Sequence, residues 1–114
     1  MANNHLTSAT FIMVAPFMVI ACTNTESPAA PADDPVLVAG QEIWSEACAS
    51  CHGSDGGGGV GPAIKGGAVL ERFEDPVEQA KLIAEGRGNM PAYAGKYDGE
   101  EIDAVVSYTR EVLN

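Results

Sequence analysis

Residues that share one helical face mark three segments of the chain, and the last segment is the clearest. Its inward positions are Ile102, Val105, Val106, Thr109, Val112 and Leu113. Asp98 lies just before this face and Glu101 follows three residues later, a spacing that lets each side chain accept from the other residue's backbone N–H. The pattern predicts a helix that starts after Asp98 and runs nearly to the end of the chain.

A similar capping pattern precedes the middle segment. Asp75 and Glu78 stand three residues apart, and Pro76 takes the first helical position. The apolar positions that follow are Val77, Ala80, Leu82, Ile83 and Ala84. Because Gly86 is available to end the helix, we expect a short helix over residues 75–86.

The first segment begins near Asp34 and runs directly into Cys48. One side of it carries Leu37, Gly40, Ile43, Trp44 and Ala47. Residues 53–67 and the stretch after Gly86 are rich in glycine, so we expect two long loops, with a flexible run at residues 56–59. No alternation of β-branched residues predicts a strand. The expected fold class is therefore all-α, with about three helices.

The first 21 residues differ from the rest of the chain. Every Asp, Glu, Lys and Arg lies at Glu26 or later, whereas residues 11–21 form an apolar run broken only by Pro16. This run is too short to cross a membrane as a helix, which takes roughly 20 residues. It has the length of the apolar part of a secretory signal. We expect residues 1–21 to be a signal peptide and the protein to be exported.

Cys22 follows directly, and the sequence Val-Ile-Ala-Cys that it ends resembles a bacterial lipobox. The resemblance implies that Cys22 is lipidated and anchors the protein to a bacterial membrane on its periplasmic side. The preceding residues contain no Lys or Arg, which departs from the usual signal, so cleavage elsewhere and a short uncleaved anchor stay open as alternatives. Residues 22–35 hold three prolines and no large apolar side chain. They are predicted to form a tether, which leaves residues 36–114 as the folded domain.

The chain is strongly acidic. It has 16 acidic and 6 basic residues, which gives a formal net charge of −10. Nucleic acid is excluded as a partner, because phosphate binding depends largely on Lys and Arg. We expect protein partners with basic docking faces.

The sequence Cys48-Ala49-Ser50-Cys51-His52 carries the candidate chemistry. Cys-x-x-Cys-His is the attachment pattern for c-type haem. Two thiols at this spacing can bond to the two vinyl groups along one haem edge, and the adjacent imidazole then faces the iron. A zinc site would need a second Cys/His pair, and the other histidine, His5, lies in the predicted signal peptide. A thioredoxin-like redox pair would need a βαβ context that the pattern lacks. We predict one covalent haem c per chain.

A second iron ligand is also identifiable. Met is a common partner of His in haem electron carriers, and Met90 is the one methionine left once the predicted signal peptide is removed. Met90 lies in a glycine-rich loop, and Pro91 keeps its backbone extended. We therefore expect His52 and Met90 to be the axial ligands. Arg87 and Lys96 flank this loop and are candidates for contact with the haem propionates.

Residues 36–114 resemble a small bacterial class I cytochrome c domain. The matching residues are Gly40, Trp44, Cys48, Cys51, His52, Gly53, the sequence Gly61-Pro62-Ala63-Ile64, the sequence Gly88-Asn89-Met90-Pro91-Ala92-Tyr93, and Tyr108. The resemblance implies the cytochrome c fold around the haem, with Gly40 at a close crossing of the first and last helices and with Trp44 and Tyr108 packed there. It also implies that the Pro62 carbonyl accepts a hydrogen bond from the His52 ring, which raises the basicity of the ligand.

These features predict single-electron transfer without catalysis, because two protein ligands leave no vacant position on the iron. The expected donor is a membrane oxidoreductase and the expected acceptor a terminal oxidase or reductase, at the periplasmic face of a bacterial membrane. Two alternatives stay open. One is a gas-binding or peroxidase-like haem protein in which Met90 is displaced, and the other is a fixed haem subunit of a larger oxidoreductase complex.

Overall fold

Helices connected by loops make up the part of the chain that the structure describes. The computed structural model describes residues 26–114, so the predictions for the signal peptide and for Cys22 lie outside the described residues. The elements are α1 (Pro35–Ile43), the π-helix η1 (Trp44–Cys48), α2 (Ala49–His52), α3 (Ala68–Arg72), α4 (Pro76–Glu85) and α5 (Gly99–Glu111). Residues 26–114 contain no strand, which confirms the all-α fold class. None of their helices has the length and apolar character needed to span a membrane.

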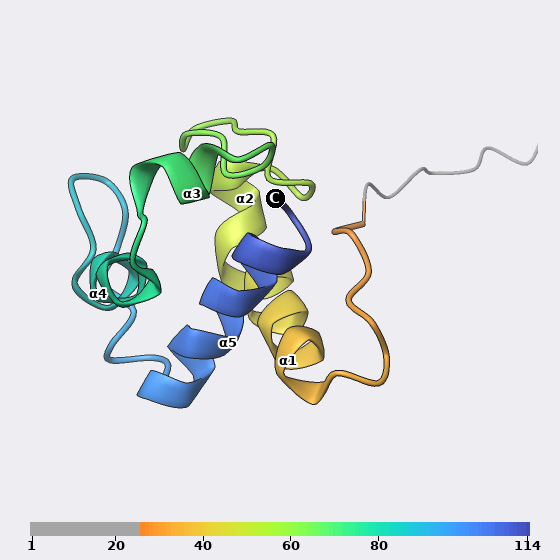
Figure 1. Cartoon of the computed structure of the whole chain (residues 1–114). Coiled ribbons are helices and arrows are strands. Elements are labelled where there is room, and N and C mark those ends of the chain that lie inside the picture. Colours follow the sequence, from red (N-terminus) through yellow and green to blue (C-terminus); the bar gives the residue numbers. More distant parts are fainter. Residues whose placement is uncertain (1–25) are drawn as a thin grey trace, which may run out of the picture.

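The crossing of α1 and α5 organises the core (Figure 1). A Cβ atom at Gly40 would overlap the backbone carbonyl oxygen of Ala104 and lie 2.7 Å from Cβ of Tyr108. Only glycine therefore allows the two helices to approach so closely. Trp44 and Tyr108 are almost completely buried beside this crossing, with ring centroids 6.3 Å apart. The expected close crossing is confirmed.

Capping residues fix where the two longest helices begin. At α5, the Asp98 carboxylate accepts from the Glu101 N–H at 3.0 Å, and the Glu101 carboxylate accepts from the Asp98 N–H at 2.9 Å, which confirms the predicted capping box. At α4, the Asp75 carboxylate accepts from the Val77 N–H at 2.8 Å, but the Glu78 carboxylate does not accept from the Asp75 N–H. The second capping pattern is therefore only half formed, and the Asp75 cap with Pro76 at the first position is sufficient to start the helix.

The helix count differs from the expected three. The first predicted helix is interrupted by η1, in which the Ala49 N–H donates to the Trp44 carbonyl five residues back. Such π-turns often lie at functional sites, and this one carries Cys48. The short helix α3 was not predicted, because a single helical turn is too short to show periodicity. It forms because Val69, which is 3% exposed, packs into the interior.

Residues 27–30 pack against the domain, and we call this segment the strap. Figure 1 shows the chain passing beside α1 before that helix begins. The Tyr108 hydroxyl donates to the Pro28 carbonyl at 2.6 Å, and the Ala30 N–H donates to Oε1 of Gln41 at 2.7 Å. A buried phenol requires a hydrogen-bond acceptor, and the strap supplies it. This part of the predicted tether is therefore packed on the domain rather than free.

Candidate functional site

A cavity of about 370 Å³ lies among η1, α2, α4 and α5, and its walls are mostly apolar. Its lining includes all five predicted haem-site residues: Cys48, Cys51, His52, Pro62 and Met90. The volume lies in the range of ordinary cofactor sites. The fold therefore brings residues from two separate loops and from the end of the first helical segment to one cavity.

The two cysteines enter the cavity from consecutive elements. Cys48 ends η1, Cys51 lies on α2, and neither is in a disulfide. Burial raises the pKa of the Cys48 thiol to about 11. Cys48 is therefore a neutral thiol at physiological pH, which suits an apolar wall. Both sulfur atoms are free to bond to a group inside the cavity.

The ring of His52 has a fixed orientation. Its Nδ1 lies 2.8 Å from the Pro62 carbonyl oxygen. A carbonyl oxygen only accepts hydrogen bonds, so Nδ1 carries the proton and Nε2 keeps its lone pair available for a metal. Gly61 packs flat against this ring, since a Cβ there would lie 2.8 Å from Cε1 of His52. The contact that the resemblance implied between Pro62 and the proximal ring is present.

The loop after His52 folds back onto the end of α2. The Gly58 N–H donates to the His52 carbonyl at 2.7 Å, and the Gly61 N–H donates to the Cys51 carbonyl at 2.8 Å. Gly58 has a φ of +94°, a conformation that favours glycine and lets the chain reverse. The expectation of a flexible run at residues 56–59 is wrong, because these backbone bonds fix the loop.

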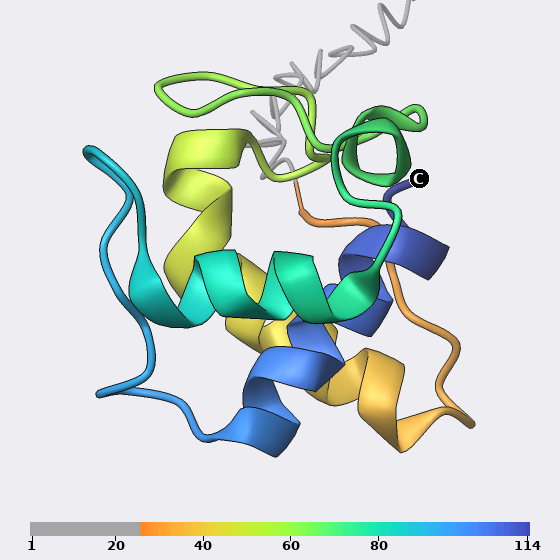
Figure 2. The same ribbon diagram turned by 60° about the vertical axis from the view of Figure 1, so that its left-hand side comes forward.

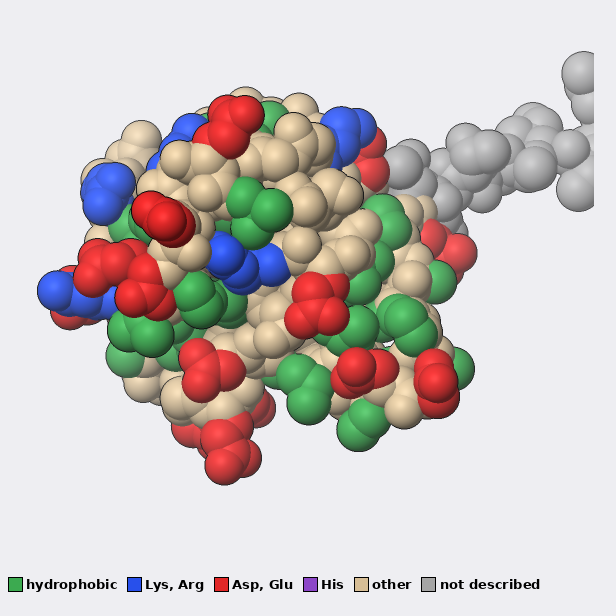
Figure 3. Space-filling model, in the orientation of Figure 1, with side chains coloured by type: hydrophobic (Ala, Val, Ile, Leu, Met, Phe, Trp, Pro, Cys, Tyr) green, Lys and Arg blue, Asp and Glu red, His purple; other side chains and the backbone are tan. Residues whose placement is uncertain are grey.

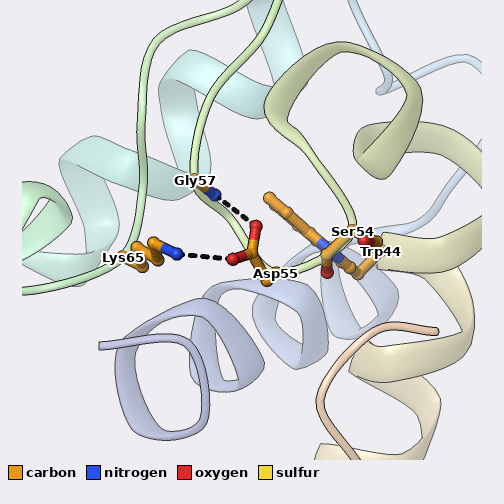
Figure 4. A network of polar contacts seen from close by, with 5 residues as sticks. All are labelled: Trp44, Ser54, Asp55, Gly57 and Lys65. Carbon is orange, nitrogen blue, oxygen red and sulfur yellow. Dashed lines mark hydrogen bonds and ion pairs between the residues drawn. The ribbon is translucent and has the colours of Figure 1, made fainter. Parts of the chain in front are cut away.

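Side chains fasten the same loop from outside (Figure 4). The Asp55 carboxylate accepts from the Gly57 N–H at 2.9 Å and also from the Lys65 ammonium group. The hydrogen bond from Lys65 holds the pKa of Asp55 below its usual range. The Trp44 indole N–H donates to the Ser54 carbonyl at 2.9 Å, which ties the loop to η1.

Met90 closes a tight turn that starts at the end of α4. The Arg87 N–H donates to the Met90 carbonyl at 3.0 Å, and the Met90 N–H donates to the Arg87 carbonyl at 2.9 Å. Gly86 ends α4 with a φ of +72°, and a Cβ there would lie 2.6 Å from the Met90 carbonyl oxygen. This glycine, predicted as the helix end, therefore also sets the approach of the Met90 turn to the cavity.

The Met90 turn is tied to the cysteine segment by two side chains that the sequence did not reveal as anchors. The Tyr93 hydroxyl donates to the Ala47 carbonyl at 2.9 Å. The Lys96 ammonium group pairs with the Glu46 carboxylate at 2.8 Å and lies 4.9 Å from the centre of the Tyr97 ring. Lys96 does not line the cavity, whereas Arg87 does. Of these two residues, only Arg87 therefore belongs to the cavity wall.

Two polar residues of the cavity wall were missed by sequence reasoning: Arg72 and Gln79. Gln79 is 4% exposed, and Thr109, which was predicted on the inward face of the last helix, is 3% exposed. A polar residue on an amphipathic helix normally faces solvent, so the sequence pattern gave no signal of the burial of Gln79.

Known proteins share both this fold and this motif. Residues 35–108 match the family described as cytochrome c oxidase, cbb3-type, subunit III. The chain is 37% identical over 95 residues to cytochrome c6 of Thermosynechococcus vestitus, covering 80% of this chain and 81% of the relative. It is 37% identical over 93 residues to the cbb3-type cytochrome c oxidase subunit CcoP of Rhodobacter capsulatus, covering 72% of this chain but only 31% of CcoP. The crystal structure of cytochrome c6C from Synechococcus sp. PCC 7002 superimposes with a TM-score of 0.54 at 33% identity, covering 62% of this chain and 89% of that one.

The fold, the cavity and these similarities define a small class I cytochrome domain. The chain belongs to the cytochrome c family, in the group that contains cytochromes c6 and cbb3-type oxidase subunits. Members of this family carry covalent haem c, and the thiols, imidazole and thioether that line one apolar cavity fit that group. The predicted cofactor, covalent haem c, is confirmed.

Proposed function

We propose that this protein transfers single electrons through a haem c bonded to Cys48 and Cys51 and ligated by His52 and Met90. The observation that carries the proposal is that both candidate ligands line one cavity, although they come from loops that lie far apart in the sequence. The chain thereby offers a nitrogen and a sulfur ligand together with two attachment points.

Bound haem supplies an iron that takes up and releases one electron. The Pro62 carbonyl holds the proton on Nδ1 of His52, so Nε2 is oriented for the metal and its basicity is raised. The Met90 sulfur, as a thioether ligand, favours the reduced iron and a higher potential. Because His52 and Met90 would both bind the iron, no position would be left for a substrate, and we propose no catalysis.

An optical spectrum of the matured protein tests the ligand set. We expect the oxidised wild type to show the weak long-wavelength absorption band typical of sulfur ligation, and Met90→Ala to lose it while the haem stays attached. Val77→Ala, which shortens a side chain on α4 that is 67% exposed and does not line the cavity, is the control and should keep the band. A wild type that binds carbon monoxide as readily as a five-coordinate haem protein would contradict the proposal.

Partners follow from the charge of the surface. All 16 acidic residues lie within the described part of the chain, and Figure 3 shows Asp and Glu side chains spread over one face of it. We propose that the donor, a membrane oxidoreductase, and the acceptor, a terminal oxidase or reductase, present basic docking faces. The rate of electron transfer to such an acceptor should fall as salt is raised. A rate that does not change with ionic strength would contradict this electrostatic docking.

The place of action is a separate proposal. We propose that residues 1–21 direct export and that Cys22 is lipidated, so that residues 36–114 work at the periplasmic face of a bacterial membrane. Cys22→Ala should move the protein from the membrane to the soluble fraction, and Thr23→Ala should not. A Cys22→Ala protein that stays with the membrane would reject the anchor.

A fixed subunit is the second candidate, favoured by the match to CcoP. In that case, the domain would pass electrons inside a permanent complex rather than shuttle between partners. Purification in mild detergent separates the two: a stable stoichiometric complex supports the subunit, and a monomer supports the shuttle.

A further inference from the structure

One end of the haem cavity is polar, although most of its wall is apolar. Gln79 on α4 and Thr109 on α5 line this end, and each is more than nine-tenths buried. Burying an amide costs free energy unless its donors and acceptor are all paired. Their hydrogen bonds therefore show what the site is arranged to hold.

The hydrogen bonds of Gln79 determine which neighbour its amide oxygen faces and which neighbour its amide nitrogen faces. Nη1 of Arg110 donates to Oε1 of Gln79 at 3.3 Å, and Nε2 of Gln79 donates to Oγ1 of Thr109 at 2.8 Å. A guanidinium group only donates, so the amide oxygen must face Arg110 and the amide nitrogen must face Thr109. The Thr109 hydroxyl in turn donates to the Val106 carbonyl at 2.9 Å. The orientation of the Gln79 amide is thus fixed by its neighbours.

This arrangement leaves one donor of Gln79 unused. Nε2 carries two protons, and within residues 26–114 only the bond to Thr109 uses one of them. The second N–H belongs to a buried side chain that lines the cavity. A hydrogen-bond acceptor on the bound group would satisfy it.

A cation lies at the same end. Arg72 ends α3, lines the cavity, and makes no ion pair with any residue of the described range. Nη1 of Arg110 also donates to the carbonyl of Phe73, the residue after Arg72, at 2.9 Å, so Gln79 lies beside the end of α3. In Figure 2, α3 lies on the side where α4 starts, and α2, which carries Cys51, lies on the side where α4 ends. The elements that carry the donor and the cation therefore lie away from the element that carries Cys51.

The chemistry of haem supplies the acceptor. Its two vinyl groups lie on one edge of the ring and its two propionates on the opposite edge, so bonds to Cys48 and Cys51 direct the propionates to the far end. We propose that the Gln79 amide and the Arg72 guanidinium bind the haem propionates and keep them ionised, an inference that rests on the proposed attachment to Cys48 and Cys51. Arg110 and Thr109 act as positioning residues for the amide.

The consequence is measurable in the reduction potential. A propionate that loses a proton lowers the potential, because negative charge stabilises oxidised iron. The potential therefore falls with pH around the propionate pKa and is flat elsewhere. Donors to the carboxylate lower that pKa and move the fall to lower pH. Removal of one donor should raise the propionate pKa by about one pH unit, which is a tenfold change in acidity.

The test is spectroelectrochemical titration of the matured holoprotein against pH. Gln79→Met keeps the size of the side chain and removes the donor, so the fall in potential should move up by about one pH unit. Gln79→Glu keeps an acceptor for Arg110 and places a second carboxylate beside the propionates, so the fall should move at least as far. Gln41→Met, on α1 beside the strap, is the matched control and should leave the curve unchanged.

Two outcomes would overturn the proposal. One is that both Gln79 variants show the same dependence of reduction potential on pH as the wild type, which would mean that Gln79 only joins α4 to α5. If neither variant folds, Arg72→Gln decides, because Arg72 is exposed: an upward shift supports the proposal, and an unchanged curve overturns it. The wild-type spectrum tests the ligand set independently, so a failure of the proposed function is recognised before the variants are compared.

Discussion

The loops on the two sides of the cavity are held by different kinds of contact. The His52 side, residues 53–67, is bonded to α2 through its own backbone and packs Gly61 against the imidazole. The Met90 side, residues 86–97, is tied to the cysteine segment by the side chains of Tyr93 and Lys96. Lys96 and Glu46 are each at least half exposed, and such surface pairs contribute little.

The difference indicates which ligand is released first. Separating the His52 side from α2 requires the loss of several backbone bonds and of the contact with Gly61. The Met90 side is joined to the cysteine segment by only one phenol bond and one surface pair, and its backbone bonds, from the Tyr93 and Ala94 N–H groups, run to α4 instead. We therefore expect Met90 to leave the iron under mild stress while His52 stays bound. Local opening of this kind needs less free energy than global unfolding.

The largest effect is expected from Gly86→Ala, on the weaker side. A Cβ there would lie 2.6 to 2.8 Å from three backbone atoms and would strain a φ of +72°. We expect a loss of about 3 kcal/mol in unfolding free energy and loss of the sulfur-ligation band, measured by urea titration and absorption. Gly88→Ala has a similar φ of +58° but open space around it, so it should cost only about 1 kcal/mol.

Gly61→Ala should have the next largest effect, on the stronger side. Its Cβ would press on the His52 ring at 2.8 Å, and the ring cannot move without losing the Pro62 bond. We expect about 2 kcal/mol of destabilisation in urea titration and less haem incorporated per chain. Gly95→Ala, where nothing lies within 4 Å, should behave as wild type. Equal behaviour of the two variants would mean that the ring is not held by this packing.

Tyr93→Phe should weaken only the Met90 side. It removes the bond to the Ala47 carbonyl and keeps the ring stacked near Tyr97. A loss of about 1 kcal/mol is expected, seen as earlier loss of the sulfur-ligation band during urea titration. The midpoint for His52 release should change less. Parallel shifts of both transitions would show that the two loops open together.

The smallest effects are expected at acid pH, as differences in stability between the wild type and two variants that each lack one ion-paired carboxylate. Hydrogen bonds from Lys65 and Lys96 hold the pKa values of Asp55 and Glu46 below their usual 3.8 and 4.5. A carboxyl group whose pKa is lowered by folding stabilises the folded protein at pH values above its usual pKa. This stabilisation is lost as the pH falls through the lowered pKa. Asp55→Asn should remove part of the acid sensitivity of the His52 side, and Glu46→Gln should do the same for the Met90 side. Urea midpoints measured from pH 6 to pH 2 give the comparison, and identical slopes in all three proteins would contradict it.

The sequence predicted the elements that local rules define. The α5 capping box and Gly86 as a helix end follow from short-range patterns. The gathering of Cys48, His52 and Met90 at one cavity was expected from the haem-attachment motif and from the family resemblance, not from local rules. The rest depends on contacts between distant segments. Gln79 is buried because it forms hydrogen bonds with Thr109 and Arg110, which lie 30 and 31 residues later in the chain. No local pattern predicts these contacts. The glycine-rich loop is ordered for the same reason, since its partners are the carbonyls of α2.

The strap limits where the domain can travel. Because Pro28 is bonded to Tyr108, only the residues between positions 22 and 27 can separate the domain from a lipid on Cys22, as proposed. An extended chain of that length spans about 17 Å. Such a carrier would be confined to a thin layer at the bilayer surface, where its local concentration near a partner in the same membrane is high and exchange with a distant membrane is out of reach.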